Sequence, residues 1–262
     1  MKIIIEKILE EIKMKIIALE FYENGHMTEG FAFGGSVDKE KINTNKQYES
    51  SLQNYLIDTG KEVILIDTGV PAATPDTEPK PGQLIYQGKK INSFIDALKK
   101  VGYEPKDVDK VIVTHKHIDH TGELRLFEHS KIYISEIEAQ AMNLKGDNVV
   151  RVDFKDGEYK NFKQSEKITE NIFMLPAYGH TKGNSIVVAE FEGLHYMFQG
   201  DVTYTDEALR QNALSVVFED KDLARETLNN VRAFVKENDT VYLSTHSPEG
   251  VTALKEKKVM KL

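Results

Sequence analysis

Short runs of β-branched and aromatic residues, separated by Gly, Asp, Asn and Pro, recur along most of the chain and predict strands. The predicted strands are residues 15–21, 54–58, 63–67, 108–114, 131–135, 149–154, 171–175, 185–191, 194–199 and 240–244. The turn sequence Thr59-Gly60-Lys61 predicts a hairpin between 54–58 and 63–67. Strands therefore dominate the predicted structure.

Apolar residues recur at helical spacing in residues 1–13, 91–101 and 220–236, which predicts three helices. Residues 1–13 mix Glu and Lys among their apolar positions, and no cleavage site follows them. They predict an amphipathic helix packed on its own domain or a partner, instead of a signal peptide or a membrane-surface helix. Met14 offers a second candidate start, so this segment is a helix or an extension. No stretch approaches the roughly 20 apolar residues that span a bilayer.

Two long polar segments, residues 23–50 and 70–90, predict loops. Loops of this length in a compact domain tend to form the lids or walls of a site. Phe31 and Phe33 in the first loop are candidates for an apolar wall or for anchors in the core. Each half of the chain shows the same order of predicted elements: a run of strands, then a helix, then a further strand. This order predicts a four-layer αββα sandwich, with two sheets face to face and helices outside.

The composition, 40% hydrophobic and 29% charged, is ordinary for a globular enzyme. The net charge of -8 argues against a nucleic-acid partner, because such affinity comes mostly from Lys and Arg on phosphate. The chain has no cysteine, so any metal site must use His and carboxylate ligands. We expect a cytoplasmic location and no stable membrane anchoring. The sequence favours neither a monomer nor an oligomer.

The segment His115-Lys116-His117-Ile118-Asp119-His120 directly follows an apolar strand. His115 and His117 share one face of an extended chain and can bind one ion together. Asp119 and His120 can turn towards a second ion. The pattern predicts a metal site, and the alternative of a solvated polar loop fits poorly at the end of a buried strand.

Three further candidate ligands, His180, Asp201 and His246, also follow predicted strands. Any one of them alone would be an ordinary loop residue, but together they place a ligand at each of four strand ends. The remaining histidines, which lack such a context, are His26, His129 and His195.

Seven ligands exceed the three that a catalytic zinc takes from a protein, and they suit two divalent ions about 3.5–4 Å apart. The predicted sets are His115, His117 and His180 for one ion and Asp119, His120 and His246 for the other, with Asp201 bridging. Zinc is expected first, and manganese, iron and cobalt accept the same ligands. Water on such ions has a pKa near 7, so a shared hydroxide can act as nucleophile.

These motifs resemble the metallo-β-lactamase superfamily, in Thr-His-Lys-His-Ile-Asp-His at 114–120, Gly-His-Thr at 179–181, Gly-Asp at 200–201 and Thr-His at 245–246. The resemblance runs from about residue 14 to residue 251 and implies a single hydrolase domain over 14–262. Within the superfamily the chain is most similar to the N-acyl-homoserine lactone lactonases. The similar segments are residues 55–57, 65–71, 101–105 and 201–204.

This resemblance implies that a hydroxide bridging two ions opens a lactone or a similar ester. Tyr204 matches the tyrosine that hydrogen-bonds the lactone carbonyl in those lactonases, three residues after the bridging Asp201. Asp119 would shuttle the proton. The resemblance also gives Asp67 a supporting role behind the ligands.

Other members of the superfamily fit less well. Common β-lactamases use a Cys ligand, and those without Cys lack the bridging aspartate that Asp201 supplies. A glyoxalase-II-like thioesterase shares all seven ligands but usually adds a helical C-terminal domain, whereas only residues 251–262 remain here. A metal-dependent nuclease would need a basic groove or an inserted arm. A non-catalytic binding module would be expected to lose ligands.

Overall fold

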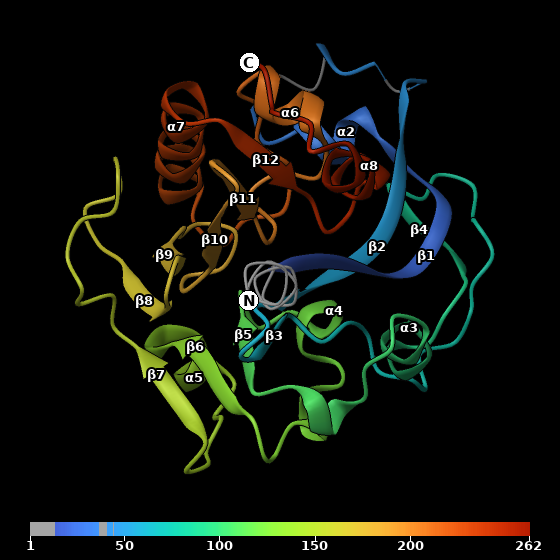
Figure 1. The fold of residues 1–262 in the computed structure, drawn as a ribbon. Coiled ribbons are helices and arrows are strands. Elements are labelled where there is room, and N and C mark those ends of the chain that lie inside the picture. Colours follow the sequence, from blue (N-terminus) through green and yellow to red (C-terminus); the bar gives the residue numbers. More distant parts are fainter. Residues whose placement is uncertain (1–13, 37–40, 44) are drawn as a thin grey trace, which may run out of the picture.

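A computed structural model describes residues 14–36, 41–43 and 45–262 (Figure 1). The helix predicted at 1–13 lies outside this part of the chain. The strands are β1 (Lys15–Thr28), β2 (Gln47–Asp58), β3 (Val63–Ile66), β4 (Ile85–Lys90), β5 (Lys110–Val113), β6 (Lys131–Ser135), β7 (Val149–Val152), β8 (Glu166–Thr169), β9 (Ile172–Pro176), β10 (Ser185–Phe191), β11 (Leu194–Phe198) and β12 (Thr240–Leu243). The helices are α2 (Glu29–Phe33), α3 (Phe94–Lys100), α4 (Ile118–Thr121), α5 (Glu136–Ala141), α6 (Asp206–Arg210), α7 (Lys221–Glu237) and α8 (Pro248–Glu256).

These strands form two sheets, one from each half of the chain. The larger sheet has the order β4-β1-β2-β3-β5-β6-β7, and the smaller has the order β12-β11-β10-β9-β8. In the larger sheet β1 to β4 pair antiparallel where they are adjacent, whereas β3, β5, β6 and β7 pair in parallel. In the smaller sheet β11 and β12 pair in parallel. Figure 1 shows the blue-to-green half beside the yellow-to-red half.

Alternating side chains on each strand divide between two cores, because successive residues of a strand point to opposite faces. In β5, Ile112 lies in the core between the sheets, whereas Val111 and Val113 pack in the core that α3 covers. In β11, Phe198 faces the other sheet and Met197 packs in the core that α7 covers. Helices thus cover the outer faces of both sheets, and the predicted αββα architecture is confirmed.

The two helices predicted at 91–101 and 220–236 are present as α3 and α7, with shifted ends. Side-chain caps set where they begin. Ser93 Oγ accepts a hydrogen bond from the backbone of Asp96 and starts α3. Asp220 caps α7 in the same way. The shorter helices α4, α5, α6 and α8 were not predicted, because few turns carry little periodicity.

The predicted loop at 23–50 is wrong over much of its length. The strand β1 continues to Thr28, α2 follows it directly, and β2 begins at Gln47. Register shifts on both sides of Tyr22 bend β1 and let it keep pairing through polar and glycine residues. Thr28 then ends the strand and caps α2, accepting a hydrogen bond from the backbone of Phe31 at 3.2 Å.

The predicted loop at 70–90 is wrong at its end, where β4 pairs with β1. This pairing needs glycine at position 88, where φ is +113° and a Cβ would lie 2.2 Å from the carbonyl oxygen of Glu23. Within the described residues, no helix combines the length and apolar character needed to cross a membrane. The assignment of 14–262 to a single domain stays a prediction.

Candidate metal centre

The seven predicted ligands converge at one end of the sandwich, just beyond the carboxyl ends of four strands. His115 follows β5, His180 follows β9, Asp201 follows β11 and His246 follows β12. Since β11 and β12 run parallel, the loops that carry Asp201 and His246 lie side by side. The sandwich thus brings together residues that are up to 131 positions apart in the sequence, from His115 to His246.

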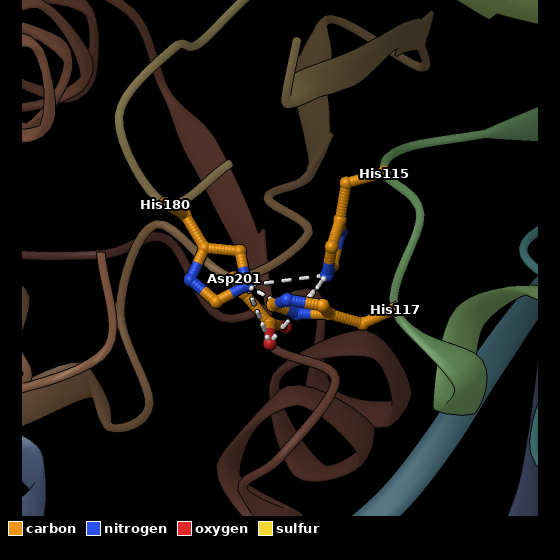
Figure 2. A group of neighbouring side chains, drawn as sticks. All are labelled: His115, His117, His180 and Asp201. Carbon is orange, nitrogen blue, oxygen red and sulfur yellow. Dashed lines mark hydrogen bonds and ion pairs between the residues drawn. The ribbon is translucent and has the colours of Figure 1, made fainter. Parts of the chain in front are cut away.

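The first group of candidate ligands comprises His115, His117, His180 and Asp201 (Figure 2). Nε2 of His115 lies 3.1 Å from Nδ1 of His117 and 3.2 Å from Nε2 of His180. The last two nitrogens are 3.0 Å apart. Figure 2 shows the three rings pointing at a common centre, with the Asp201 carboxylate beside it.

The second group comprises Asp119, His120 and His246, whose ligand atoms lie within 4.8 Å of one another. Nε2 of His246 lies 3.4 Å from the Asp119 carboxylate. His120 and His246 are buried, whereas the side chain of Asp119 is 19% exposed to solvent. Asp119 is therefore the ligand of this group that solvent can reach most easily.

Asp201 lies between the two groups. One carboxylate oxygen, Oδ2, is 3.5 Å from Nε2 of His180 and 3.1 Å from Nε2 of His246. The other, Oδ1, is 3.3 Å from Nε2 of His120. The carboxylate is thus within reach of both groups at once, in the position that a bridging ligand requires.

Behind the second group, Asp67 holds His120 in place. The backbone of Asp67 has φ +61°, and its carboxylate accepts hydrogen bonds of 2.7 Å from the backbone N–H and the hydroxyl of Thr114. His120 Nδ1 lies 2.7 Å from the same carboxylate. An imidazole that donates from Nδ1 to a carboxylate leaves the Nε2 lone pair free for an ion.

Two more contacts orient ligand histidines from behind, and sequence reasoning missed both. His180 Nδ1 lies 3.2 Å from the carbonyl oxygen of Val217, and His246 Nδ1 lies 3.4 Å from Oε1 of Gln87. A backbone carbonyl carries no sequence signal. Gln87 stands 159 positions from His246, in a segment predicted as loop, so no local pattern could have found it.

Burial and neighbouring charges set the protonation of the ligands. Burial, together with nearby His120 and His180, holds the pKa of His115 well below its usual value. Burial lowers the pKa of His180 to about 4. Burial alone would raise the pKa of Asp201, but the imidazoles of His246 and His120 hold it well below its usual value. At neutral pH His115 and His180 are therefore neutral imidazoles and Asp201 is a carboxylate, which are the forms that bind metal.

The donor set fits metal ions. His120 Nε2 and Asp201 Oδ1 face each other while buried and without a hydrogen-bond partner in the described chain, as two ligands of one ion would. Burial opposes protonation of His120, yet the carboxylates around it raise its pKa well above its usual value, so this end of the site favours positive charge. In the first group, the nitrogens are spaced close to the roughly 3.3 Å expected around a tetrahedral ion with bonds of about 2.0–2.1 Å.

Tyr204 lies against this centre. Its hydroxyl donates to Asp201 Oδ2 at 3.0 Å, and its ring stacks on His246 with a centroid distance of 5.0 Å. Burial, with Asp201 and Asp119 nearby, raises its pKa well above the usual value. The phenol therefore keeps its proton at neutral pH and remains a hydrogen-bond donor.

Phe31 and Phe33, the candidates for an apolar wall, are both buried in a cluster around Tyr204. Phe31 meets the Tyr204 ring edge-on at 4.7 Å, and Phe33 meets Tyr48 at 5.1 Å. They serve here as core anchors, and Phe31 also supports Tyr204. The three histidines left out of the predicted site belong to neither ligand group; His26, for example, packs on Tyr86.

The family model described as the metallo-beta-lactamase superfamily matches residues 53–246, which span all seven predicted ligands. An N-acyl homoserine lactonase from Bacillus sp. is 25% identical over 202 residues, covering 74% of this chain and 80% of that relative. The resemblance seen in the motifs is confirmed.

Solved structures agree on the fold. An N-acyl homoserine lactone hydrolase with the product N-hexanoyl-L-homoserine bound at its catalytic metal centre matches with a TM-score of 0.68 at 19% identity. That match covers 92% of this chain and 96% of the other. AidC, a dizinc quorum-quenching lactonase, matches with a TM-score of 0.65 at 15% identity over 90% and 88% of the two chains.

Proposed function

Because this chain belongs to the metallo-beta-lactamase superfamily, we propose that it is a dinuclear metal-dependent hydrolase that opens a lactone or a similar small ester. The observation that carries the proposal is the position of Asp201, within reach of both ligand groups and hydrogen-bonded to Tyr204. The lactonase activity named for the Bacillus relative supports the choice of substrate class.

Each group of ligands would hold one ion, with Asp201 between them. Zinc is the ion we expect first, and the dizinc lactonase among the structural neighbours supports this choice. When bound, such ions polarise a carbonyl and lower the pKa of water towards about 7. Asp67, Gln87 and the Val217 carbonyl orient the ligand imidazoles from behind, so that little reorganisation accompanies binding.

Tyr204 and Asp119 would act on the substrate. The neutral phenol of Tyr204 can turn its proton from Asp201 towards an ester carbonyl and stabilise the negative charge that develops there. Asp119 is the partly exposed ligand, and its carboxylate can receive a proton and pass it to the departing alkoxide. Both side chains already lie beside the centre, since Tyr204 bonds Asp201 and Asp119 lies 3.4 Å from His246.

We further propose that the natural substrate is a small molecule and not a nucleic acid, which the net charge of -8 supports. A cytoplasmic location stays a prediction. Neither statement affects the chemistry proposed for the site.

A substrate panel tests the proposal. Purified protein loaded with zinc or manganese would be assayed on acyl-homoserine lactones, other lactones, nitrocefin and S-lactoylglutathione. We expect hydrolysis of one or more lactones at a kcat/KM well above that for the thioester or the β-lactam. Activity on the thioester alone would overturn the lactonase assignment, and a protein that binds no ion would overturn the whole proposal.

A further inference from the structure

A buried carboxylate outside the seven ligands lies behind the first group. Glu138 belongs to α5, and its side chain has no solvent exposure. Glutamate is rarely buried to this extent without partners, because removing a carboxylate from water is costly. Oε2 accepts a hydrogen bond from the backbone N–H of Lys116 at 2.8 Å, and Oε1 accepts one from the backbone N–H of Gly183 at 2.7 Å.

The two amides belong to the two loops that carry the first group. Lys116 lies between His115 and His117, in the loop after β5 of the larger sheet. Gly183 lies three residues after His180, in the loop between β9 and β10 of the smaller sheet. Each loop brings imidazoles from a different sheet, and the carboxylate of Glu138 joins the two.

The close approach of α5 to the second loop shows that this contact is tight. A Cβ at Gly183 would lie 2.8 Å from Cγ of Glu138 and 2.6 Å from Oγ of Ser135, so only glycine fits there. Ser135 Oγ also donates to the carbonyl of Gly183 at 2.7 Å and caps α5 by accepting from the Glu138 N–H. Ser135 and Glu138, at the start of α5, thus bind the carbonyl and the N–H of Gly183, three residues after His180.

A second carboxylate joins the same loops nearer the surface. Glu219 pairs with the ammonium of Lys116 at 2.6 Å and accepts a hydrogen bond from the backbone N–H of Lys182 at 2.9 Å. Its side chain is 32% exposed, so this bridge is screened by solvent and weaker than the buried one. Two carboxylates therefore connect the loop of His115 and His117 to the loop of His180.

We propose that Glu138 is a positioning residue for the first metal group, which fixes the imidazoles of His117 and His180 at the separation that one ion requires. This inference rests on the proposed metal centre. A carboxylate suits the task because it offers an acceptor to each of two N–H donors, whereas an amide offers one acceptor and one donor. In Glu138→Gln, one loop amide faces an NH₂ group and loses its partner.

The test measures metal affinity at each group separately. Zinc titration against a chromophoric chelator would be carried out in two backgrounds. His246→Ala keeps all ligands of the first group, and His180→Ala keeps all ligands of the second group. We expect Glu138→Gln to weaken zinc binding about 10–100-fold in the first background and to leave it close to unchanged in the second.

Matched variants separate positioning from stability. Glu136→Gln makes the same chemical change two residues away on α5, where the carboxylate pairs with Arg151 at the surface, and should leave both affinities unchanged. Ser130→Ala removes a buried hydroxyl that donates to the carbonyl of Val108, before β5 and away from the ligand loops, and it should lower Tm while keeping zinc affinity. Should Glu138→Gln not fold, Glu138→Asp keeps the charge and both acceptors at a shorter reach, and we expect a loss of affinity confined to the first group.

Equal loss of zinc affinity in both backgrounds, or unchanged affinity in the first, would overturn the positioning role while leaving the proposed function intact. A loss of zinc affinity in Ser130→Ala in proportion to its fall in Tm would also overturn the positioning role. Absence of zinc binding by the chain with all seven ligands would overturn the metal centre, and this inference with it.

Discussion

The hydroxyl of Tyr204 donates to Oδ2 of Asp201 over 3.0 Å, so the proposed carbonyl donor and the proposed bridging ligand share one hydrogen bond. The ring of Tyr204 is held between His246 and Phe31. Tyr204 can therefore act in two ways that experiments can separate: by donating to the substrate carbonyl and by holding the carboxylate of Asp201.

Tyr204→Phe keeps the stacked ring and removes only the hydroxyl. We expect kcat/KM on the best lactone to fall about 10²–10³-fold, as for the loss of one donor to a developing oxyanion, with the metal content unchanged. Steady-state kinetics and elemental analysis would measure both. Tyr48→Phe, in the same aromatic cluster, is the control and should keep its activity. A Tyr204→Phe protein that lost metal would show that the hydroxyl acts mainly through Asp201.

His246→Ala removes a ligand from the second group, whereas His129→Ala removes an exposed histidine elsewhere. We expect His246→Ala to retain about one ion per chain and His129→Ala to bind as many as the unmodified chain. Elemental analysis after dialysis gives the stoichiometry. Equal metal loss in both variants would contradict the assignment of His246.

Removal of the ions by a chelator should lower the Tm of the unmodified chain. Ions at about 1,000-fold above their Kd stabilise the folded state by about 4 kcal/mol.

Asp67→Asn tests the support behind His120. An amide that turns its NH₂ towards His120 Nδ1 makes that nitrogen an acceptor and moves the proton to Nε2, where the ion should bind. We expect an affinity about 10–100-fold weaker for one of the two ions, measured by chelator competition. Asp109→Asn changes a carboxylate that accepts from the backbone of Val63, and it serves as control. Unaltered zinc binding in Asp67→Asn would rule out this supporting role.

Asp206 is not a proposed metal ligand, and its burial predicts that the free energy of unfolding depends on pH. Burial, with Glu249 nearby, raises its pKa from 3.8 to about 7. Between these values the folded chain holds a proton that the unfolded chain has lost, so the free energy of unfolding falls as pH rises from about 4 to 7. The difference between these two pKa values corresponds to about 4 kcal/mol of unfolding free energy at most.

Asp206→Asn is neutral at every pH, so we expect its free energy of unfolding to fall less between pH 5 and pH 7.5. Urea unfolding at the two pH values, with the same metal loading, gives the difference. Glu207→Gln, at a partly exposed neighbouring position, should keep the full pH dependence. The prediction fails if Asp206→Asn and the unmodified chain lose the same free energy over this interval.

Local sequence pattern determined the frame of the fold. Short apolar runs in segments such as β5 and β11 identified strands buried on both faces, because each face of such a strand packs on a different layer. The clustered ligands from His115 to His120 were also visible locally, since four of them occur within six residues after a strand. Local pattern gave a wrong prediction of a loop for residues 23–50, because the bulges of β1 place glycine and polar residues inside a paired strand.

The tertiary structure alone decided how the candidate ligands lie relative to one another. Asp201 lies within reach of both groups because His180, His120 and His246 approach its carboxylate from separate elements. Tyr204 could be matched to a motif, but only packing showed that its hydroxyl meets Asp201. Glu138 and Gln87 carry no local signal, since their partners lie 22 to 159 positions away. The physical reason is that a short pattern reports which side of one element is buried, whereas contacts between elements depend on how the two sheets pack.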